Sequence, residues 1–577
     1  MKKTISVPFW RLILAMLAIA GVSRVSAGAP LPSYTITGVV IDSVTGNAVP
    51  RCHLESSLIA RSRGPGRRPP QTSGGFDADE HGRFTISLPS AGAWHLTASA
   101  PGYVSQAYDE HSNYSSAIVL SSSVPSLDLK FRLPLQARLS GVVLDEAGEA
   151  VRNATVQLLR QPIPGPERDV QQFSSRSFIQ TDDRGAYEFA NLAPGNYRLA
   201  VQARPWYASF ARQRQFSGGF AFSTAAVKDP SLDVTYQLTW YPGMDDPEQA
   251  ETLALRAGDD RRADFHLVPI PSLHLQIVLP PVVQQADGRT IPSFPIVERI
   301  DSSGGNMGFS QTSTTTSPQG QIDVAGLSPG TYRLRLQGQN QDSRSAVITL
   351  SEGTSRVIDF SAAAGAMSNV AVHFDNDEDD DRPPPVELTD TTTGQRFFPF
   401  GGGRPMPVNV RRGPQNQTPR EISLQVPPGR YEVRLQNRGD VYLTGISAQG
   451  AEAAGRFLTV HGGDVVLTLR TASGRGTITG VASAHGQPCA GALVLLVPAG
   501  LDDPQSFTTS ARDQSNTDGS FDLEDVVPGQ YILIAIDHGW NVNLSDPSTL
   551  RGYLTQGVPI DLRSGVNLKQ NIDAQAP

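Results

Sequence analysis

The sequence has few of the residues from which metal centres and nucleophilic sites are usually built. Its 577 residues include two cysteines and ten histidines, and the histidines are scattered along the chain without pairing. The motifs Gly-x-Ser-x-Gly, Gly-x-x-x-x-Gly-Lys and His-Glu-x-x-His, which carry hydrolase, phosphate-binding and metalloprotease chemistry, are absent. We therefore predict that the protein is not an enzyme.

Positive charge and long hydrophobic runs are also scarce. The net charge is −8 and no basic face is evident, so we expect no nucleic acid partner. The one long apolar run, residues 12–22, follows Lys2, Lys3 and Arg11, which predicts a signal peptide at residues 1–27. Because this run is shorter than the roughly 20 residues of a membrane span, we expect no transmembrane segment after cleavage. The mature protein is expected to be exported, either to the periplasm or outside the cell.

Glycine and proline, in contrast, are abundant, and they mark a turn that recurs along the chain. There are 54 glycines and 44 prolines, and the hydrophobic fraction of 39% is sufficient for packed cores. A glycine stands two residues before an aromatic at intervals of roughly 100 residues. This repetition indicates an array of like domains. The pairs are Gly92 and Trp94, Gly195 and Tyr197, Gly330 and Tyr332, Gly429 and Tyr431, and Gly529 and Tyr531.

Apolar alternation around these turns predicts the fold of each domain. Every copy shows an opening strand, a second apolar run, a pair of strands around the Gly-x-aromatic turn, and a closing hairpin. We predict an all-β protein, a tandem array of about five seven-stranded, Greek-key or prealbumin-like β-sandwiches, with the aromatic residue in each core. The predicted domains are residues 34–134, 135–270 with an aromatic insertion, the divergent copies 271–364 and 365–472, and 473–577.

The two cysteines occupy similar places in the first and the last of these domains. Cys52 and Cys489 each follow a turn that contains proline. We expect them to lie about four domains apart, whereas a disulfide requires Cα atoms within about 7 Å of each other. Two buried, unpaired thiols are therefore expected.

The second copy carries a family resemblance. Residues 181–199, together with the opening strand at 139–143, resemble the carboxypeptidase regulatory-like domain. The resemblance extends over most of residues 34–577, and in the third and fourth copies it rests mainly on the Pro-Gly-x-Tyr turn. It implies a prealbumin-like, carbohydrate-binding-like sandwich, related to the collagen-adhesin B-type repeat, in an exported multi-repeat protein. Because turn and core residues carry the resemblance, it implies a fold rather than a chemistry.

The name of this family suggests an enzyme, but the residues do not support catalysis. A zinc carboxypeptidase needs a His-x-x-Glu pair and a distant histidine, whereas His53 and Glu55 are only two residues apart. The collagen-adhesin relatives often carry an isopeptide crosslink that starts from a lysine in the opening strand. After the leader, lysine occurs only as Lys130, Lys228 and Lys569, none of them in an opening strand, so we expect no crosslink.

An acidic run stands where other copies have their first hairpin turn. Asp375, Asp377 and Asp379 alternate with other polar residues, and alternate carboxylates can gather Ca²⁺. The run lacks the glycine and the distal glutamate of an EF-hand loop, and a charge run is usually a solvated loop. We therefore expect no cofactor, with Ca²⁺ at these three residues as the alternative.

The second domain contains a long insertion that is rich in aromatic residues and arginine. If the protein binds a ligand, we expect this insertion to carry the main site, because exposed aromatic rings stack on sugars or anchor protein partners. The candidate residues are Trp206, Tyr207, Trp240 and Tyr241 for stacking, and Arg204 and Arg212 for hydrogen bonds. The alternative is a small satellite core under a long loop.

Two functions are compatible with these features. The first is a non-catalytic exported protein that binds a carbohydrate or a cell-envelope protein through the loops of its sandwiches. The second is a structural spacer or assembly protein of the envelope without a discrete ligand site. Exposed aromatic rings would favour the first function, whereas buried aromatics and large contacts between domains would favour the second.

Overall fold

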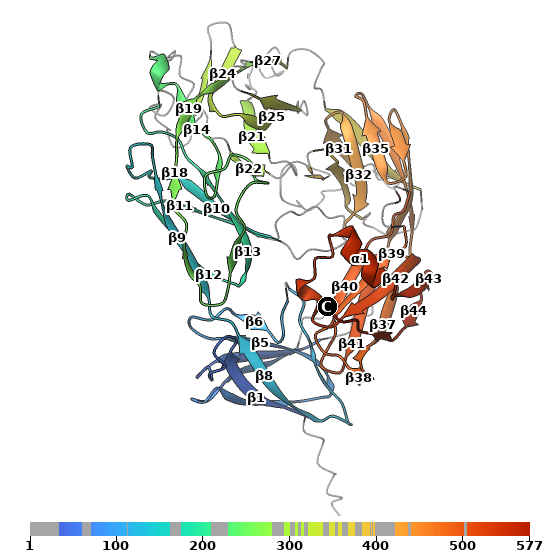
Figure 1. The fold of residues 1–577 in the computed structure, drawn as a ribbon. Coiled ribbons are helices and arrows are strands. Elements are labelled where there is room, and N and C mark those ends of the chain that lie inside the picture. Colours follow the sequence, from blue (N-terminus) through green and yellow to red (C-terminus); the bar gives the residue numbers. More distant parts are fainter. Residues whose placement is uncertain are drawn as a thin grey trace, which may run out of the picture.

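A computed structural model describes most of the chain as an almost entirely β structure (Figure 1). The described residues are 34–59, 71–111, 113–161, 175–208, 229–279, 294–300, 306–309, 313–316, 321–337, 345–351, 356–360, 367–375, 384–392, 394, 396–398, 422–436, 440–500, 503 and 505–577. The predicted signal peptide lies outside these residues.

The first repeat shows the architecture that the others share, a sandwich of two sheets around one core. Its strands are β1 (Tyr34–Asp42), β2 (His53–Leu58), β3 (Gln71–Asp77), β4 (Arg83–Leu88), β5 (Gly92–Ser99), β6 (Gln106–Ala107), β7 (Ile118–Leu120) and β8 (Ser126–Leu133). One sheet has the order β4-β1-β8, and the other has the order β3-β2-β5-β6, with β7 also beside β5. Side chains of period two fill the space between the sheets, as with Phe84, Ile86 and Leu88 of β4.

The second repeat adds short elements at its end. Its strands are β9 (Ala137–Leu144), β10 (Thr155–Arg160), β11 (Ser175–Gln180), β12 (Ala186–Leu192), β13 (Gly195–Gln202), β15 (Thr239–Trp240), β16 (Leu253–Leu255), β17 (Asp260–Arg262) and β18 (Phe265–His266). The added elements are the 3-10 helix η2 (Pro230–Leu232) and the strands β14 (Val234–Tyr236) and β19 (Pro269–Pro271). The two sheets have the orders β12-β9-β17 and β11-β10-β13-β15, and β14 pairs with β19.

The third and fourth repeats keep the same two sheets. The third has β20 (Leu273–Val278), β21 (Phe294–Ile300), β22 (Asn306–Phe309), β23 (Ser313–Thr316), β24 (Gln321–Leu327), β25 (Gly330–Gln337), β26 (Ser345–Leu350) and β27 (Arg356–Asp359). The fourth has β28 (Ser368–Phe374), β29 (Val386–Asp390), β30 (Arg396–Phe397), β31 (Ile422–Val426), β32 (Gly429–Leu435), β33 (Tyr442–Gln449), β34 (Glu452–Ala454), β35 (Phe457–Val460) and β36 (Val465–Ala472).

The fifth repeat has a short helix, which the sequence analysis did not predict. Its elements are β37 (Gly476–Ala484), β38 (Gln487–Pro488), β39 (Leu493–Pro498), β40 (Ala511–Gln514), β41 (Ser520–Val526), β42 (Gly529–Ile536), η3 (Gly539–Asn541), α1 (Pro547–Leu554), β43 (Val558–Leu562), β44 (Asn567–Lys569) and β45 (Ile572–Asp573). Asp546 caps α1 by accepting a hydrogen bond from Thr549 N at 2.9 Å. With five such units, the predicted tandem array of β-sandwiches is confirmed.

The predicted closing hairpin of each repeat is wrong, because its two strands belong to different sheets. In the first repeat β7 pairs antiparallel with β5, whereas β8 crosses to the other sheet and pairs parallel with β1. The same parallel pairing joins β9 with β17, β20 with β27, β28 with β36 and β37 with β44. Apolar alternation cannot distinguish a hairpin from a crossing between sheets, because both arrangements bury alternate side chains.

The aromatic residues of the recurring turn fill the cores, as predicted. Each ring is at most 4% exposed, and each donates a hydrogen bond to the backbone carbonyl of the residue four positions earlier. The pairs are Trp94 with Ser90 at 3.3 Å, Tyr197 with Ala193 at 2.7 Å, Tyr332 with Ser328 at 2.7 Å, Tyr531 with Val527 at 2.5 Å, and Tyr431 with Pro427. One side chain thus packs the core and closes the turn that joins the two sheets.

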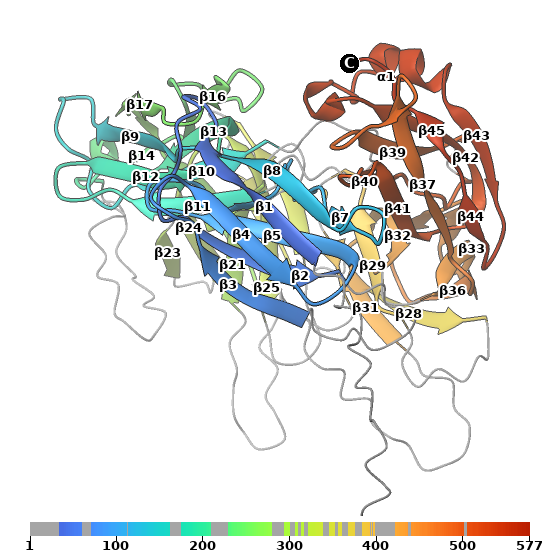
Figure 2. The same cartoon turned by 90° about the horizontal axis from the view of Figure 1, so that it is seen from below.

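The five repeats follow a closed path, so that the first and the last lie side by side (Figure 1 and Figure 2). Hydrogen bonds join these two repeats, for example from Ala117 N to Asn516 Oδ1 at 2.9 Å. The expected separation of four domains between Cys52 and Cys489 is therefore wrong, because the two residues belong to neighbouring repeats. Both thiols are buried and unpaired, as expected. A repeat pattern specifies each domain but not the angle between successive domains, so it does not show this curvature.

Candidate functional site

The described part of the aromatic insertion presents one large ring to solvent. Trp206 follows β13 and is 76% exposed. Its ring lies edge-on against Tyr207, with the ring centroids 5.7 Å apart and the planes at 89°. An exposed tryptophan beside a second aromatic ring offers a flat apolar face to a partner. The exposure of Trp206 is therefore compatible with the binding role predicted for this insertion.

Tyr207 is fixed to the first turn of the same repeat by a carboxylate. The Tyr207 hydroxyl donates a hydrogen bond to Glu146 Oε1, and the Tyr236 hydroxyl donates to Glu146 Oε2 at 3.1 Å. Burial, and then the bond to Glu146, raise the pKa of Tyr207 above its usual value, so the hydroxyl remains a donor. Sequence reasoning missed Glu146, because no pattern links an exposed turn residue to a tyrosine about 60 positions later.

The two arginines predicted for this site have different outcomes. Arg204 is half-buried, and burial lowers the pKa of its guanidinium. A guanidinium that has lost part of its hydration gains more from a hydrogen-bond acceptor than a fully hydrated one does. Arg212 lies outside the described residues, as does the rest of the insertion at 209–228.

The predicted stacking role of Trp240 is not supported, because its ring is buried. Trp240 is only 1% exposed and forms a small cluster with Leu159, Ala200, Leu238 and Ala250. Trp240 lies on β15, which pairs with β13 and places Trp240 opposite Ala200. The ring covers Leu159 of β10 and Ala200 of β13, whereas the adjacent residues of these two strands face the main core. This is the satellite core that the sequence analysis named as the alternative.

Tyr241, the fourth aromatic candidate, lies between core and surface. It is half-buried, packs on the main core of the second repeat, and meets Phe265 edge-on with the ring centroids 5.8 Å apart. Of the four aromatic candidates, Trp206 is therefore the one with a largely exposed ring. The structure brings Trp206 and Tyr207 together and assigns Trp240 to packing.

The acidic run is described only at its first residue. Asp375 is exposed at the end of β28, and its carboxylate lies 3.6 Å from Arg470 Nε. Asp377 and Asp379 lie outside the described residues. Among the described residues, no group of three or more His, Cys, Asp or Glu side chains is arranged to hold a metal ion.

His274 forms a bridge between repeats that the scattered histidines of the sequence did not suggest. Its Nε2 lies 2.7 Å from Asp233 Oδ2 near the end of the second repeat, and its Nδ1 lies 2.9 Å from Asp323 Oδ2 on β24. These hydrogen bonds raise the pKa of His274 to about 10, because both carboxylates favour the protonated ring. Within the described part of the chain, the other oxygen of each carboxylate is buried without a hydrogen-bond partner.

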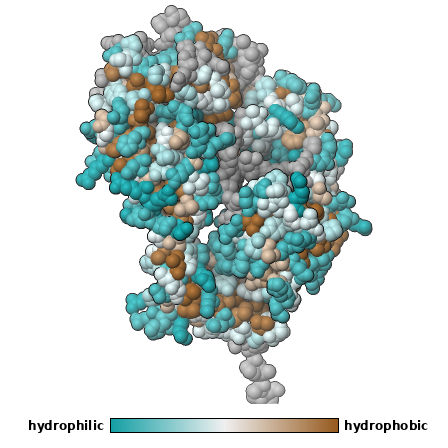
Figure 3. Space-filling model, in the orientation of Figure 1, coloured by the Kyte–Doolittle hydropathy of each residue, from teal (hydrophilic) through white to brown (hydrophobic). Residues whose placement is uncertain are grey.

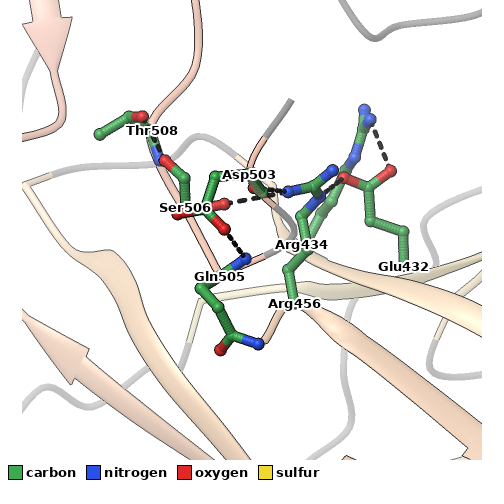
Figure 4. A network of polar contacts seen from close by, with 7 residues as sticks. All are labelled: Glu432, Arg434, Arg456, Asp503, Gln505, Ser506 and Thr508. Carbon is green, nitrogen blue, oxygen red and sulfur yellow. Dashed lines mark hydrogen bonds and ion pairs between the residues drawn. The ribbon is translucent and has the colours of Figure 1, made fainter. Parts of the chain in front are cut away.

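A second polar bridge joins the fourth and fifth repeats. Figure 4 shows Arg456 between Glu432 and the backbone of the fifth repeat. Its Nε donates to Glu432 Oε1 at 2.9 Å, and its Nη1 donates to the carbonyls of Asp503 at 2.8 Å and Ser506 at 3.2 Å. The side chain of Arg456 is 12% exposed, so this bridge is largely shielded from water. Contacts of this kind fix the angle between neighbouring sandwiches.

The surface is mainly hydrophilic on the face shown in Figure 3, where hydrophobic patches are small and separate. None of the helices within the described ranges is long and apolar enough to cross a membrane. Among the described residues of the second repeat, Phe178 is the other largely exposed aromatic, at 75% exposure, and it provides a reference for Trp206.

Comparisons with known proteins find one matching family model and several solved structures of low sequence identity and low TM-score. Solved structures similar to the chain include the Bacillus anthracis TIE protein, with 11% identity, a TM-score of 0.15 and coverage of 73% of this chain and 68% of that one. A streptococcal ancillary pilin has 13% identity and a TM-score of 0.18, and the match covers 57% of this chain and 98% of that one. A minor pilin of Streptococcus agalactiae has 11% identity and a TM-score of 0.19, and the match covers 41% of this chain and 97% of that one. No curated protein sequence matches the chain. Residues 138–268 match the family model of the carboxypeptidase regulatory-like domain, and the second repeat is therefore similar to that domain, as the sequence indicated.

Proposed function

We propose that the protein is a non-catalytic, exported protein that binds a polysaccharide of the cell envelope through the loop that presents Trp206. The observation that carries this proposal is the 76% exposure of the Trp206 ring beside Tyr207. Contact between an exposed tryptophan ring and water is unfavourable, and a partner that covers the ring removes this cost. Sugar rings offer flat apolar faces of matching size.

The support beneath Trp206 favours binding over accidental exposure. Tyr207 is tied to Glu146, which also accepts a hydrogen bond from Tyr236, so the backbone next to Trp206 has a fixed position. A rigid aromatic side chain contributes contact area at low conformational entropy cost. Half-buried Arg204 lies two residues away and supplies hydrogen-bond donors for hydroxyl or acidic groups of the ligand.

The alternative of a spacer that spans a distance is less compatible with the closed path of the repeats. A spacer gains length when its ends point apart, whereas here the first and fifth repeats are hydrogen-bonded to each other. A compact assembly component of the envelope stays open as the second candidate, because polar bridges such as Arg456 hold the repeats at fixed angles.

Replacing Trp206 by alanine tests the binding proposal. We expect retention of the protein on an envelope polysaccharide matrix to weaken by roughly 30-fold, because truncation of a central aromatic costs about 2 kcal/mol. The melting temperature should stay within about 1 °C of the original, since substitutions of exposed side chains change stability little. Binding isotherms on purified polysaccharides and thermal melting by circular dichroism give both quantities.

Phe178→Ala is the matched control, because this ring has the same exposure in the same repeat. The control should leave retention unchanged. If both substitutions weakened retention equally, general surface hydrophobicity would explain the effect, and the proposed Trp206 site would be refuted. Retention on envelope protein extracts but on no polysaccharide would assign the Trp206 surface to a protein partner.

For the acidic run we propose a solvated loop without bound metal. Added Ca²⁺ at millimolar concentration should then leave the melting temperature unchanged, because a ligand stabilises only the state that binds it. Differential scanning calorimetry with CaCl₂, and with MgCl₂ as the control, checks this expectation. A Ca²⁺-specific rise that disappears in the variant with Asp377→Asn and Asp379→Asn would establish a metal site instead.

A further inference from the structure

The first and fifth repeats, which are the two ends of the repeat path, meet in a surface that we call the end-to-end contact. It consists of residues 109–111 and 113–119 on one side and residues 491, 514–517 and 540 on the other. Backbone groups and side chains pair in register across it. Val119 N donates to Thr517 Oγ1 at 2.9 Å, and Thr517 N donates to Ala117 O at 3.0 Å. Ala117 N in turn donates to Asn516 Oδ1 at 2.9 Å. These reciprocal bonds define one relative position of the two repeats.

A buried polar cluster forms the centre of the end-to-end contact. Gln514 Nε2 donates to Asp109 O at 2.5 Å and to Ser116 Oγ at 2.9 Å, and Gln514 Oε1 lies 3.1 Å from His111 Nδ1. Ser116 Oγ donates to Ser515 O at 2.8 Å. Ser116 and Gln514 are each 1% exposed. The two surfaces therefore satisfy each other's buried polar groups across the contact.

Aromatic rings of the first repeat cover a tryptophan of the fifth. His111 stacks on Trp540 with the ring centroids 5.4 Å apart and the planes at 8°, and Tyr114 lies at 5.4 Å and 31°. Beside them, a Cβ added to Gly491 would lie only 2.4 Å from Asp109 Oδ2. The two surfaces are therefore closely packed as well as hydrogen-bonded.

The end-to-end contact joins two different surfaces, and both cysteines are free, so no disulfide closes it. We propose that the same contact forms between two copies of the chain, with the first repeat of one copy binding the fifth repeat of another when the closed path is opened. In an intact chain the two surfaces compete from within one molecule, at an effective concentration on the order of millimolar, so the chain closes on itself. Opened copies associate head to tail, because the joined surfaces are not the same patch.

Two variants, each damaged on one side of the contact, test the proposal. One carries His111→Ala and Tyr114→Ala in the first repeat, and the other carries Gln514→Ala in the fifth. Each variant alone lacks one of the two surfaces in every copy, so it should be an expanded single chain with a larger hydrodynamic radius. An equimolar mixture restores one intact pair of surfaces and should give a species with twice the mass of one chain. Light scattering after size-exclusion chromatography measures mass and radius together.

Val124→Ala is the control, because this side chain is exposed in the first repeat outside the contact. The original chain and this control should stay compact single chains, and circular dichroism melting should show that all variants are folded. Absence of the double-mass species in the mixture at about 1 mM, which matches the effective concentration within one chain, would overturn the proposal. Association of either variant with itself would overturn it too, since another surface would then be responsible. The Trp206 site is unaffected by either result.

Discussion

Replacing Gly480 by alanine should destabilise the fifth repeat by about 3 kcal/mol, which lowers the melting temperature of that repeat by roughly 10–20 °C. Gly480 lies in β37 at the point where the last strand of the repeat changes from β44 to β45. A Cβ there would be 1.8 Å from Gln570 O and 2.7 Å from Phe521 Cζ. A backbone oxygen this close cannot remain in place, so the parallel pairing of the last strand must shift.

The same close approach occurs in the other repeats of strong family resemblance. A Cβ at Gly141 would lie 1.9 Å from Ala263 O, and one at Gly38 would lie 2.3 Å from Leu129 O. The glycine of the opening strand therefore makes room for the last strand of its own repeat. This is a role in packing, which explains why the residue recurs at the same place.

Gly552→Ala provides the matched control within the same repeat. Gly552 is an exposed residue of α1, and a Cβ there would have no atom within 4 Å. Alanine should stabilise this helix by about 0.5–1 kcal/mol, because it has the higher helix propensity. Differential scanning calorimetry compares the two variants. If the Gly480 variant and the original chain had similar melting temperatures, the close approach of β37 and Gln570 would be contradicted.

The sequence predicted the fold because its signals are local. Apolar alternation and the Gly-x-aromatic turn identify the strands and the buried ring of each repeat, for example Tyr431, without knowledge of distant partners. The partner of a strand is not a local property. Apolar alternation therefore predicts a closing hairpin, although β8 and its equivalents pair parallel with the opening strand.

The candidate site was predictable only in part, for the same reason. Composition placed aromatic residues in the insertion, but burial depends on what lies opposite each ring. Trp240 faces Leu159 and Ala200 on the outer side of a sheet, whereas Trp206 projects from the loop. Contacts between repeats, such as that of Trp540 with His111, were not predictable, because the angles between domains that bring them together are absent from a repeat pattern.

Raising the pH from 6.5 to about 10 should weaken the junction between the second and third repeats. The hydrogen bonds to Asp233 and Asp323 raise the pKa of His274 from 6.5 to about 10. A group whose pKa is higher in the folded state stabilises the fold fully at pH values below its unfolded pKa. This contribution to the free energy of unfolding is lost as the pH rises through the folded pKa. Because the site is partly open to water, we expect a loss of about 2 kcal/mol rather than the full value of the shift.

The variant His274→Gln separates this effect from general alkaline destabilisation. Glutamine keeps hydrogen-bonding capacity but does not titrate, so its stability should change less between pH 6.5 and 10 than that of the original chain. Chemical unfolding at a series of pH values, followed by circular dichroism, gives the difference between the two slopes. Identical slopes would show that His274 is not held protonated between the two carboxylates. The loss would then have to come from groups elsewhere in the chain, because the glutamine variant retains Asp233 and Asp323 and lacks only the titrating ring.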